Sequence, residues 1–227
     1  MTFRTIIEQG YFLNFNQEID SESKFRHEFC GQHSISGAYC PNCKKTLLRF
    51  LDIDFNDERL TFLSNQKHIN LLYCWTCNVA QDHFYYQILN PQTIKILFFG
   101  EGGAVTDFPY EDYPIFFQSR FPNLEIISKE EQTLLSKMNQ GWPGISEIRK
   151  INNKLIRPQH QIGGEPQLPQ GELDELICPI CKKFMPFLAM IGNDCDHPQG
   201  LCGNDYVAVI YYYCNKCSVV GVMQQCD

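Results

Sequence analysis

Each half of this sequence contains two Cys-x-x-Cys pairs, and these four pairs limit what the chain can fold into. The first half carries Cys40/Cys43 and Cys74/Cys77, and the second half carries Cys178/Cys181 and Cys214/Cys217. In each half roughly thirty residues separate the two pairs, a spacing at which two hairpin turns fold together into a tetrahedral cage of four thiolates. The pattern predicts two structural zinc ions, one in each half.

The two halves also match around their cysteines. Residues 40–45 read Cys-Pro-Asn-Cys-Lys-Lys, and residues 178–183 read Cys-Pro-Ile-Cys-Lys-Lys. An apolar run follows each, at Phe50-Leu51 and at Phe187-Leu188. The offset between the halves stays at about 138 residues, which favours an internal duplication. We expect an α+β, mainly antiparallel β fold with two related zinc-ribbon-containing lobes.

Other interpretations of the cysteine pairs remain open. Thioredoxin-like redox chemistry expects one pair at the start of a helix within a βαβ pattern, which the sequence does not show. Disulfides are typical of secreted proteins, whereas the chain starts with Met-Thr-Phe-Arg and lacks the pattern of a signal peptide. We therefore expect a cytoplasmic protein, in which buried free thiols are the remaining alternative to zinc.

Four further cysteines lie outside the two cages, and their role stays open: Cys30, Cys195, Cys202 and Cys226. Each is either a small buried hydrophobic residue or a functional one. Cys195, His197 and Cys202 share one loop, but a third metal there would need a fourth ligand that the loop itself does not supply.

Composition bounds the kinds of partner. With 227 residues, 44% of them hydrophobic, the chain can bury a substantial core, and its longest apolar stretch is far shorter than the roughly 20 residues that span a membrane. Its 19 Lys and Arg against 26 Asp and Glu give a net charge of −7, which argues against nucleic acid. Lys44-Lys45 and Lys182-Lys183 instead offset the charge of the thiolate cages. We expect the partner to be another, basic protein.

Patterns along the chain indicate three regions: an N-terminal β-rich lobe over residues 1–127, a helical connector over 128–158 and a C-terminal lobe over 159–227. In the connector, Ser128 and Glu131 form a capping box, Gly141 suits a helix stop, and 145–155 suggest a weaker second helix. Apolar runs and alternation predict strands in both lobes, at 46–54, 69–74, 83–89, 93–99, 184–191, 206–213 and 219–224.

The segment 107–117 is aromatic, acidic and interrupted by prolines. Its rings either cover the interface between the lobes or form a recognition surface that selects a basic partner. In the second case the partner-binding residues are Asp107, Phe108, Tyr110, Glu111, Asp112 and Tyr113.

Residues 160–170 contain two glycines, which can take positive φ, and two prolines, which prevent pairing inside a sheet. The segment is therefore expected to be rich in turns. His160 at its start is either a metal ligand or base, or a hydrogen-bonded structural residue, the commoner role for a lone histidine beside Gly-Gly.

Three segments carry a resemblance to known families. Residues 161–170 read Gln-Ile-Gly-Gly-Glu-Pro-Gln-Leu-Pro-Gln; Met185–Ile191 follows, and then the aromatic run Gly203–Tyr213. These segments resemble the YwqG-like bacterial family and, with the cysteine pairs, are similar to the carboxy-terminal domain of the eukaryotic programmed-cell-death-two proteins. The resemblance covers 160–227 and, more loosely, 33–90.

The resemblance implies a protein-binding role. Members of the bacterial family are proposed to be immunity proteins of polymorphic toxin systems, and the eukaryotic relatives chaperone a ribosomal protein. We expect a zinc-stabilised immunity protein that binds and neutralises a toxin domain, with a chaperone for a basic, ribosomal-type client as the alternative. A zinc enzyme is the outside alternative, because closed thiolate cages leave no open coordination position and no catalytic motif is present.

Overall fold

The computed structural model describes residues 9–15, 25–60, 63–64, 66–74, 83–99, 114–141, 144, 146, 148, 155, 160–171, 175–192 and 207–226. The helix α1 spans Lys129–Asn139, and the strands are β1 Gly10–Asn14, β2 Glu28–Phe29, β3 Leu48–Asp54, β4 His68–Tyr73, β5 Phe84–Asn90, β6 Thr93–Phe99, β7 Asn123–Ile126, β8 Gln161–Gly163, β9 Phe187–Ile191, β10 Val207–Cys214 and β11 Val219–Cys226. The mainly antiparallel β class with a helix is confirmed. No helix in these ranges has the length and apolar character to cross a membrane.

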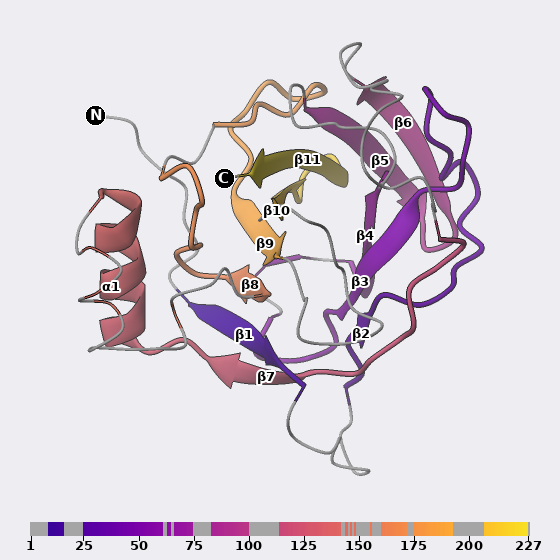
Figure 1. Ribbon diagram of the computed structural model, residues 1–227. Helices are drawn as coiled ribbons and strands as arrows, with labels where there is room; N and C mark the ends of the chain where they lie inside the picture. Colours follow the sequence, from indigo (N-terminus) through magenta and orange to yellow (C-terminus); the bar gives the residue numbers. More distant parts are fainter. Residues whose placement is uncertain are drawn as a thin grey trace.

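The strands build two sheets. The larger has eight strands in the order β6-β5-β11-β10-β9-β8-β1-β7, and the smaller has three in the order β2-β3-β4. Neighbouring strands run antiparallel throughout. In Figure 1 the larger sheet curves from β6 through β11 and β9 to β7, with β3 and β4 on the open side of the curve.

Both halves of the chain contribute to the larger sheet. Strand β11 pairs with β5, where Val220 lies opposite Tyr86, and β8 pairs with β1, where Ile162 lies opposite Tyr11. The regions 1–127 and 159–227, suggested as two lobes, are therefore joined by backbone hydrogen bonds at two places. Unfolding of either region would expose a strand edge of the other.

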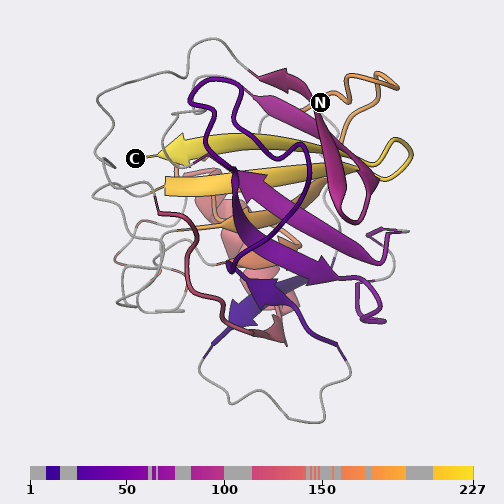
Figure 2. The same ribbon diagram turned by 90° about the vertical axis from the view of Figure 1, so that its right-hand side faces the viewer.

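The two sheets pack face to face over one hydrophobic core. Phe50 of β3 and Ile69 of β4 are fully buried against Tyr211 of β10 and Val222 of β11 in the same cluster. Figure 2 shows β3 and β4 crossing over β10 and β11. The Tyr86 hydroxyl of β5 joins the layers, because it donates to the Asn70 carbonyl oxygen at 2.7 Å and accepts from the Leu72 N–H at 3.2 Å.

A second cluster covers the opposite face of β9, β10 and β11. Strand alternation turns Ile210 and Tyr212 away from the first core, and they pack with Leu176 and Met185 of the segment between β8 and β9. This segment contains the third Cys-x-x-Cys pair, Cys178 and Cys181. The hairpin that carries Cys178 and Cys181 therefore packs against the sheet through apolar side chains.

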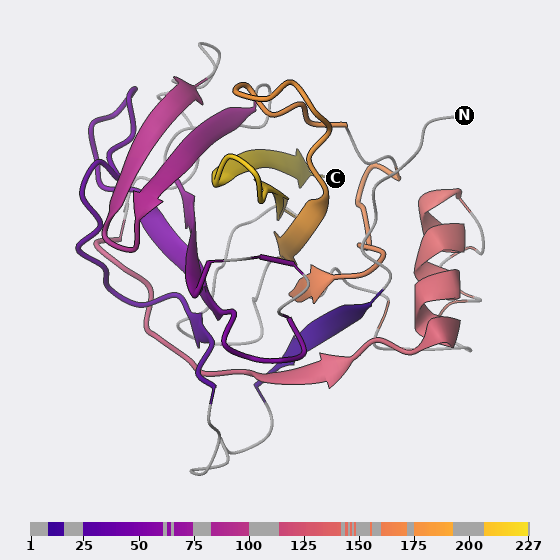
Figure 3. The ribbon, with the colours of Figure 1, turned by 180° about the vertical axis from the view of Figure 1, so that it is seen from behind.

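Helix α1 begins as predicted. The Ser128 side chain accepts from the Glu131 N–H at 3.2 Å, and the Glu131 carboxylate accepts from the Ser128 N–H at 2.9 Å. Leu134 and Leu135 pack with Phe12 of β1, and Figures 1 and 3 place the helix outside the β8–β1 part of the sheet. Most of the predicted second helix, 145–155, lies outside the described residues.

The last helical residue anchors the turn-rich segment that follows β8. The Asn139 amide donates to the Glu165 carboxylate and to the Pro166 carbonyl oxygen, both at 2.8 Å, and its oxygen accepts from the Leu168 N–H at 3.0 Å. Asn139 is buried. These contacts join the end of α1 to residues 165–168.

The expectation that residues 160–170 do not pair inside a sheet is wrong for Gln161–Gly163. This strand, β8, lies between β1 and β9. Pro166 and Pro169 come after the paired residues, so they cost the sheet no hydrogen bond. The glycines behave as predicted, since Gly163 and Gly164 take φ values of 63° and 70°.

We expect Asn139→Ala to lower the free energy of unfolding by about 2–3 kcal/mol, because it removes three buried hydrogen bonds. Urea unfolding at neutral pH measures the change. Gln140→Ala is the matched control: Gln140 is exposed and its amide contacts only Ser136 Oγ, at 3.4 Å, within the described residues. A loss that is equal in both variants would contradict the anchoring role of Asn139.

Candidate metal centres

Four sulfur atoms meet at one end of the β10–β11 hairpin. The Sγ atoms of Cys178, Cys181, Cys214 and Cys217 all lie within 4.8 Å of one another. Cys181 Sγ and Cys214 Sγ are 3.6 Å apart, close to the about 3.8 Å expected between two ligands of a tetrahedral ion with metal–sulfur bonds of about 2.3 Å. The cluster fits a metal ion and leaves no open coordination position.

A second cluster gathers Cys40, Cys43 and Cys74, whose sulfur atoms also lie within 4.8 Å of one another. Cys43 Sγ and Cys74 Sγ are 3.6 Å apart. Cys77, the predicted fourth ligand, lies outside the described residues. The eight cysteines whose side chains the structure describes are all free, and the sulfur distances within the clusters greatly exceed a disulfide bond of about 2.05 Å.

The two hairpins that carry the first cysteine pairs have the same geometry. The Cys40 N–H donates to the Lys45 carbonyl oxygen and the Cys178 N–H donates to that of Lys183, both at 2.9 Å. Lys44 and Lys182 take the left-handed φ values of 62° and 59°. The matching residues of the two hairpins are separated by about 138 positions, which is the offset between the two halves of the sequence.

Local contacts give the thiols of the four-sulfur cluster different pKa values. A hydrogen bond from the Lys183 backbone lowers the pKa of Cys181 to about 7, whereas burial raises the pKa of Cys214 to about 12. Sulfurs this close cannot all carry negative charge unless a cation stabilises them. A divalent ion at the centre would supply that charge, and a thiolate set favours zinc over oxygen-seeking ions.

Within the described part of the chain, no other predicted site residue joins the two clusters. Cys30 is buried in the main core, and the Cys195 and Cys202 loop lies outside the described residues. So do all six candidate partner-binding residues, which fall between 107 and 113. His160 is buried, and its ring contacts those of Phe15 and Phe29, with centroids 5.8 and 4.7 Å away.

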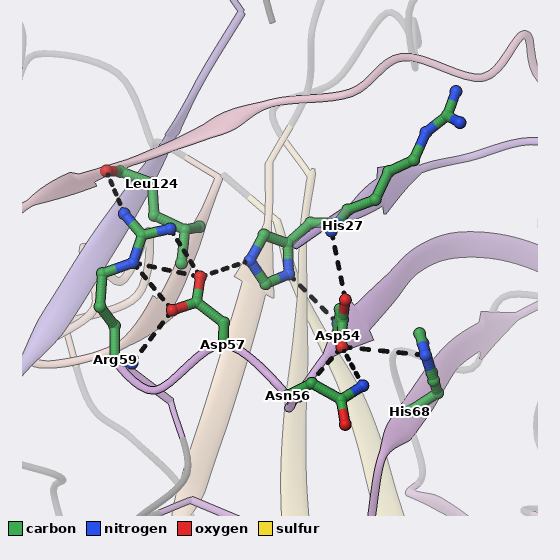
Figure 4. Close-up of polar contacts among 8 residues, drawn as sticks. His27, Asp54, Asn56, Asp57, Arg59, His68 and Leu124 are labelled. Atoms are coloured by element: carbon green, nitrogen blue, oxygen red, sulfur yellow. Dashed lines mark hydrogen bonds and ion pairs between the residues drawn. The ribbon is translucent and has the colours of Figure 1, made fainter. Parts of the chain in front are cut away.

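A buried polar network near β3 was missed by the sequence reasoning (Figure 4). His27 Nε2 lies 3.1 Å from Asp57 Oδ2, and these side chains are only 3% and 1% exposed. Arg59 donates to both oxygens of Asp57, with its shortest contact at 2.6 Å, and to the Leu124 carbonyl oxygen of β7 at 3.3 Å. Only the turn at 56–58 was visible in the sequence, because His27 and Leu124 are distant from this turn along the chain.

The network contains a His–Asp pair of the kind found in catalytic sites, but internal hydrogen bonds occupy both ring nitrogens of the histidine. The Asp54 N–H donates to His27 Nδ1 at 3.2 Å, so Nε2 carries the hydrogen that is donated to Asp57. Both ring nitrogens are thereby used inside the protein. The network holds the turn after β3 against β7.

The acid–base behaviour of Asp57 follows from these contacts. Burial alone would raise the pKa of the Asp57 carboxyl, but hydrogen bonds from His27 and Arg59 outweigh burial and hold the pKa well below its usual range. A carboxyl whose pKa is lower in the folded chain stabilises the fold above its unfolded pKa of about 3.9, and this contribution is lost as the pH falls further.

Comparisons with known proteins provide no relative from which a function could be inferred. No protein-family model, curated protein or solved structure matches this chain. The metal clusters and the chemistry around them therefore carry the functional argument.

We expect Cys214→Ser to remove one of two bound metal ions per chain, because a serine hydroxyl is a much poorer ligand than a thiolate. Native mass spectrometry of the purified chain counts the ions. Cys30→Ala is the control, since Cys30 belongs to neither cluster, and it should keep both ions. A wild-type chain purified without metal, or a Cys214→Ser chain that keeps two ions, would contradict this assignment.

We expect Asp57→Asn to lower the free energy of unfolding by about 2–3 kcal/mol, because a buried network loses its only ionised acceptor group for His27 and Arg59. The loss should be present from pH 8 to pH 5, where the Asp57 carboxyl is ionised in both the folded and the unfolded chain. Asp52→Asn is the matched control: its partner His68 is 41% exposed, so the cost should stay below about 1 kcal/mol. Urea unfolding of both variants across this pH range measures the two changes in the free energy of unfolding.

Proposed function

We propose that this chain is a cytoplasmic, zinc-stabilised protein-binding module that neutralises a basic toxin domain by occluding it. Each cysteine cluster holds one zinc ion, and Cys77 completes the first. The zinc ions are structural. Metal binding to such sets contributes on the order of 10–16 kcal/mol in small zinc peptides, enough to decide whether the surrounding loops fold.

The closed four-sulfur cluster is the observation that carries this proposal. Four cysteine ligands saturate a tetrahedral ion, whereas hydrolytic zinc keeps one position for water. The one His–Asp pair buried in the described part of the chain is likewise occupied by structural contacts. Both features favour binding over catalysis.

Charge supports a basic partner. The chain carries a net charge of −7, which accelerates association with a positively charged protein and disfavours polyanions. The matched hairpins at 40–45 and 178–183 support an origin by duplication of a zinc-binding unit. The two copies provide two hairpins, at 40–45 and 178–183, whose surroundings can form a binding surface.

Co-expression tests the proposed role. A bacterial strain producing the protein encoded beside this gene should stop growing, and this chain should restore growth and form a complex with that protein. Raising the salt concentration should slow association, because steering by opposite charges is screened. Cys214→Ser should lose the protection, while Leu89→Ser, a change on the exposed end of β5, should keep it.

Other results would redirect or reject the proposal. A neighbouring product that is harmless and does not bind contradicts the toxin role. Binding restricted to a nascent or unassembled ribosomal protein, with defective ribosomal subunits after deletion, would identify a chaperone instead. Turnover of a substrate by the purified chain would contradict both binding roles.

A further inference from the structure

The hairpin of the second cluster exposes three large apolar side chains. Ile177 is 47% exposed, Ile180 47% and Phe184 56%. Ile177 and Phe184 lie opposite each other in an isolated antiparallel bridge, flanked by the hydrogen bonds from Cys178 to Lys183 and from Met185 to Leu176. In such a non-hydrogen-bonded pair the side chains approach closely on one face.

The first hairpin shows that the fold does not require Ile180 or Phe184 to be apolar, although Tyr39, which is also exposed, occupies the position of Ile177. Tyr39 and Thr46 form the matching bridge, with the same flanking hydrogen bonds, and Asn42 takes the position of Ile180. The same backbone therefore forms around cysteines with Asn and Thr where the second hairpin has Ile and Phe. An exposed Ile and Phe that the fold does not need indicate a contact surface.

The second hairpin also carries exposed positive charge. Lys182, Lys183 and Lys216 are all exposed, and Glu175 is the only acidic residue among the described residues 175–192. In the first hairpin the Lys44 ammonium donates to the Pro41 carbonyl oxygen. No matching side-chain contact of Lys182 is found within the described part of the chain, so its charge is available to a partner.

We propose that Ile177, Ile180 and Phe184, with Lys182, Lys183 and Lys216, form a docking face for a polypeptide segment that carries apolar side chains next to Asp or Glu. The apolar residues supply the buried contact, and the lysines select carboxylates. A polyphosphate backbone would match the lysines but would leave the two isoleucines without a role. This face has the opposite charge preference to the whole chain, so it is a second site, independent of the toxin-binding role.

Peptide selection tests this docking face directly. A phage-displayed library of random peptides is selected on the full-length, zinc-loaded chain, and enriched peptides are then synthesised with a fluorescent label. We expect them to combine apolar residues with Asp or Glu. Fluorescence anisotropy should show at least tenfold weaker binding to the double variant Ile180→Asn, Phe184→Thr, which carries the residues of the first hairpin.

Two further variants keep the test independent of folding. Lys182→Glu with Lys216→Glu should also weaken binding at least tenfold and should reduce its salt dependence. Leu89→Ser, at another exposed apolar position, should bind as the wild type does. All variants should retain two metal ions per chain and the far-ultraviolet circular dichroism spectrum of the wild type.

Several outcomes would overturn the proposal. Enriched peptides that are basic, or that bind the double variant as tightly as the wild type, exclude this face as the site. An oligothymidylate probe that binds in place of the peptides, and is lost in the same variants, would identify a nucleic-acid surface. A concentration-dependent dimer that disappears in the double variant would show that a second copy of the chain occupies the face.

Discussion

The two sulfur clusters close the open ends of the strand pairs on which the fold is built. Cys40 and Cys43 precede β3 and Cys74 follows β4, while Cys178 and Cys181 precede β9 and Cys214 ends β10. A metal ion at each cluster would therefore join the start of one strand to the end of its partner. Because the intervening loops are long, such cross-links would lower the conformational entropy of the unfolded chain and hold the strand ends together.

The larger sheet turns these two local units into one structure. If each half folded around its own metal alone, the halves would touch only through side chains. Instead β5 pairs with β11 and β1 with β8, and the Tyr73 hydroxyl of the smaller sheet donates to Gln224 of β11. Loss of one metal should therefore weaken both halves, because strands on either side of the connector depend on the same hydrogen bonds.

Short sequence patterns predicted those elements whose structure depends mainly on neighbouring residues. The cysteine spacing located both clusters, the Ser128–Glu131 box gave the start of α1, and alternation located β3, β4, β5, β6, β9, β10 and β11. Short strands with distant partners were missed: β1, β2, β7 and β8 have at most five residues each. The Asn139 anchor and the His27–Asp57 contact were also missed, because each joins residues that approach only after the sheets have packed.

Comparison of the two hairpins separates what the metal requires from what remains free to vary. Cysteines, a left-handed lysine and one pair of backbone hydrogen bonds recur in both. Two corresponding positions differ, with Asn42 and Thr46 on one hairpin and Ile180 and Phe184 on the other. Since the same backbone accepts either set, the fold does not require Ile180 and Phe184 to be apolar, and their exposure supports the proposed docking face.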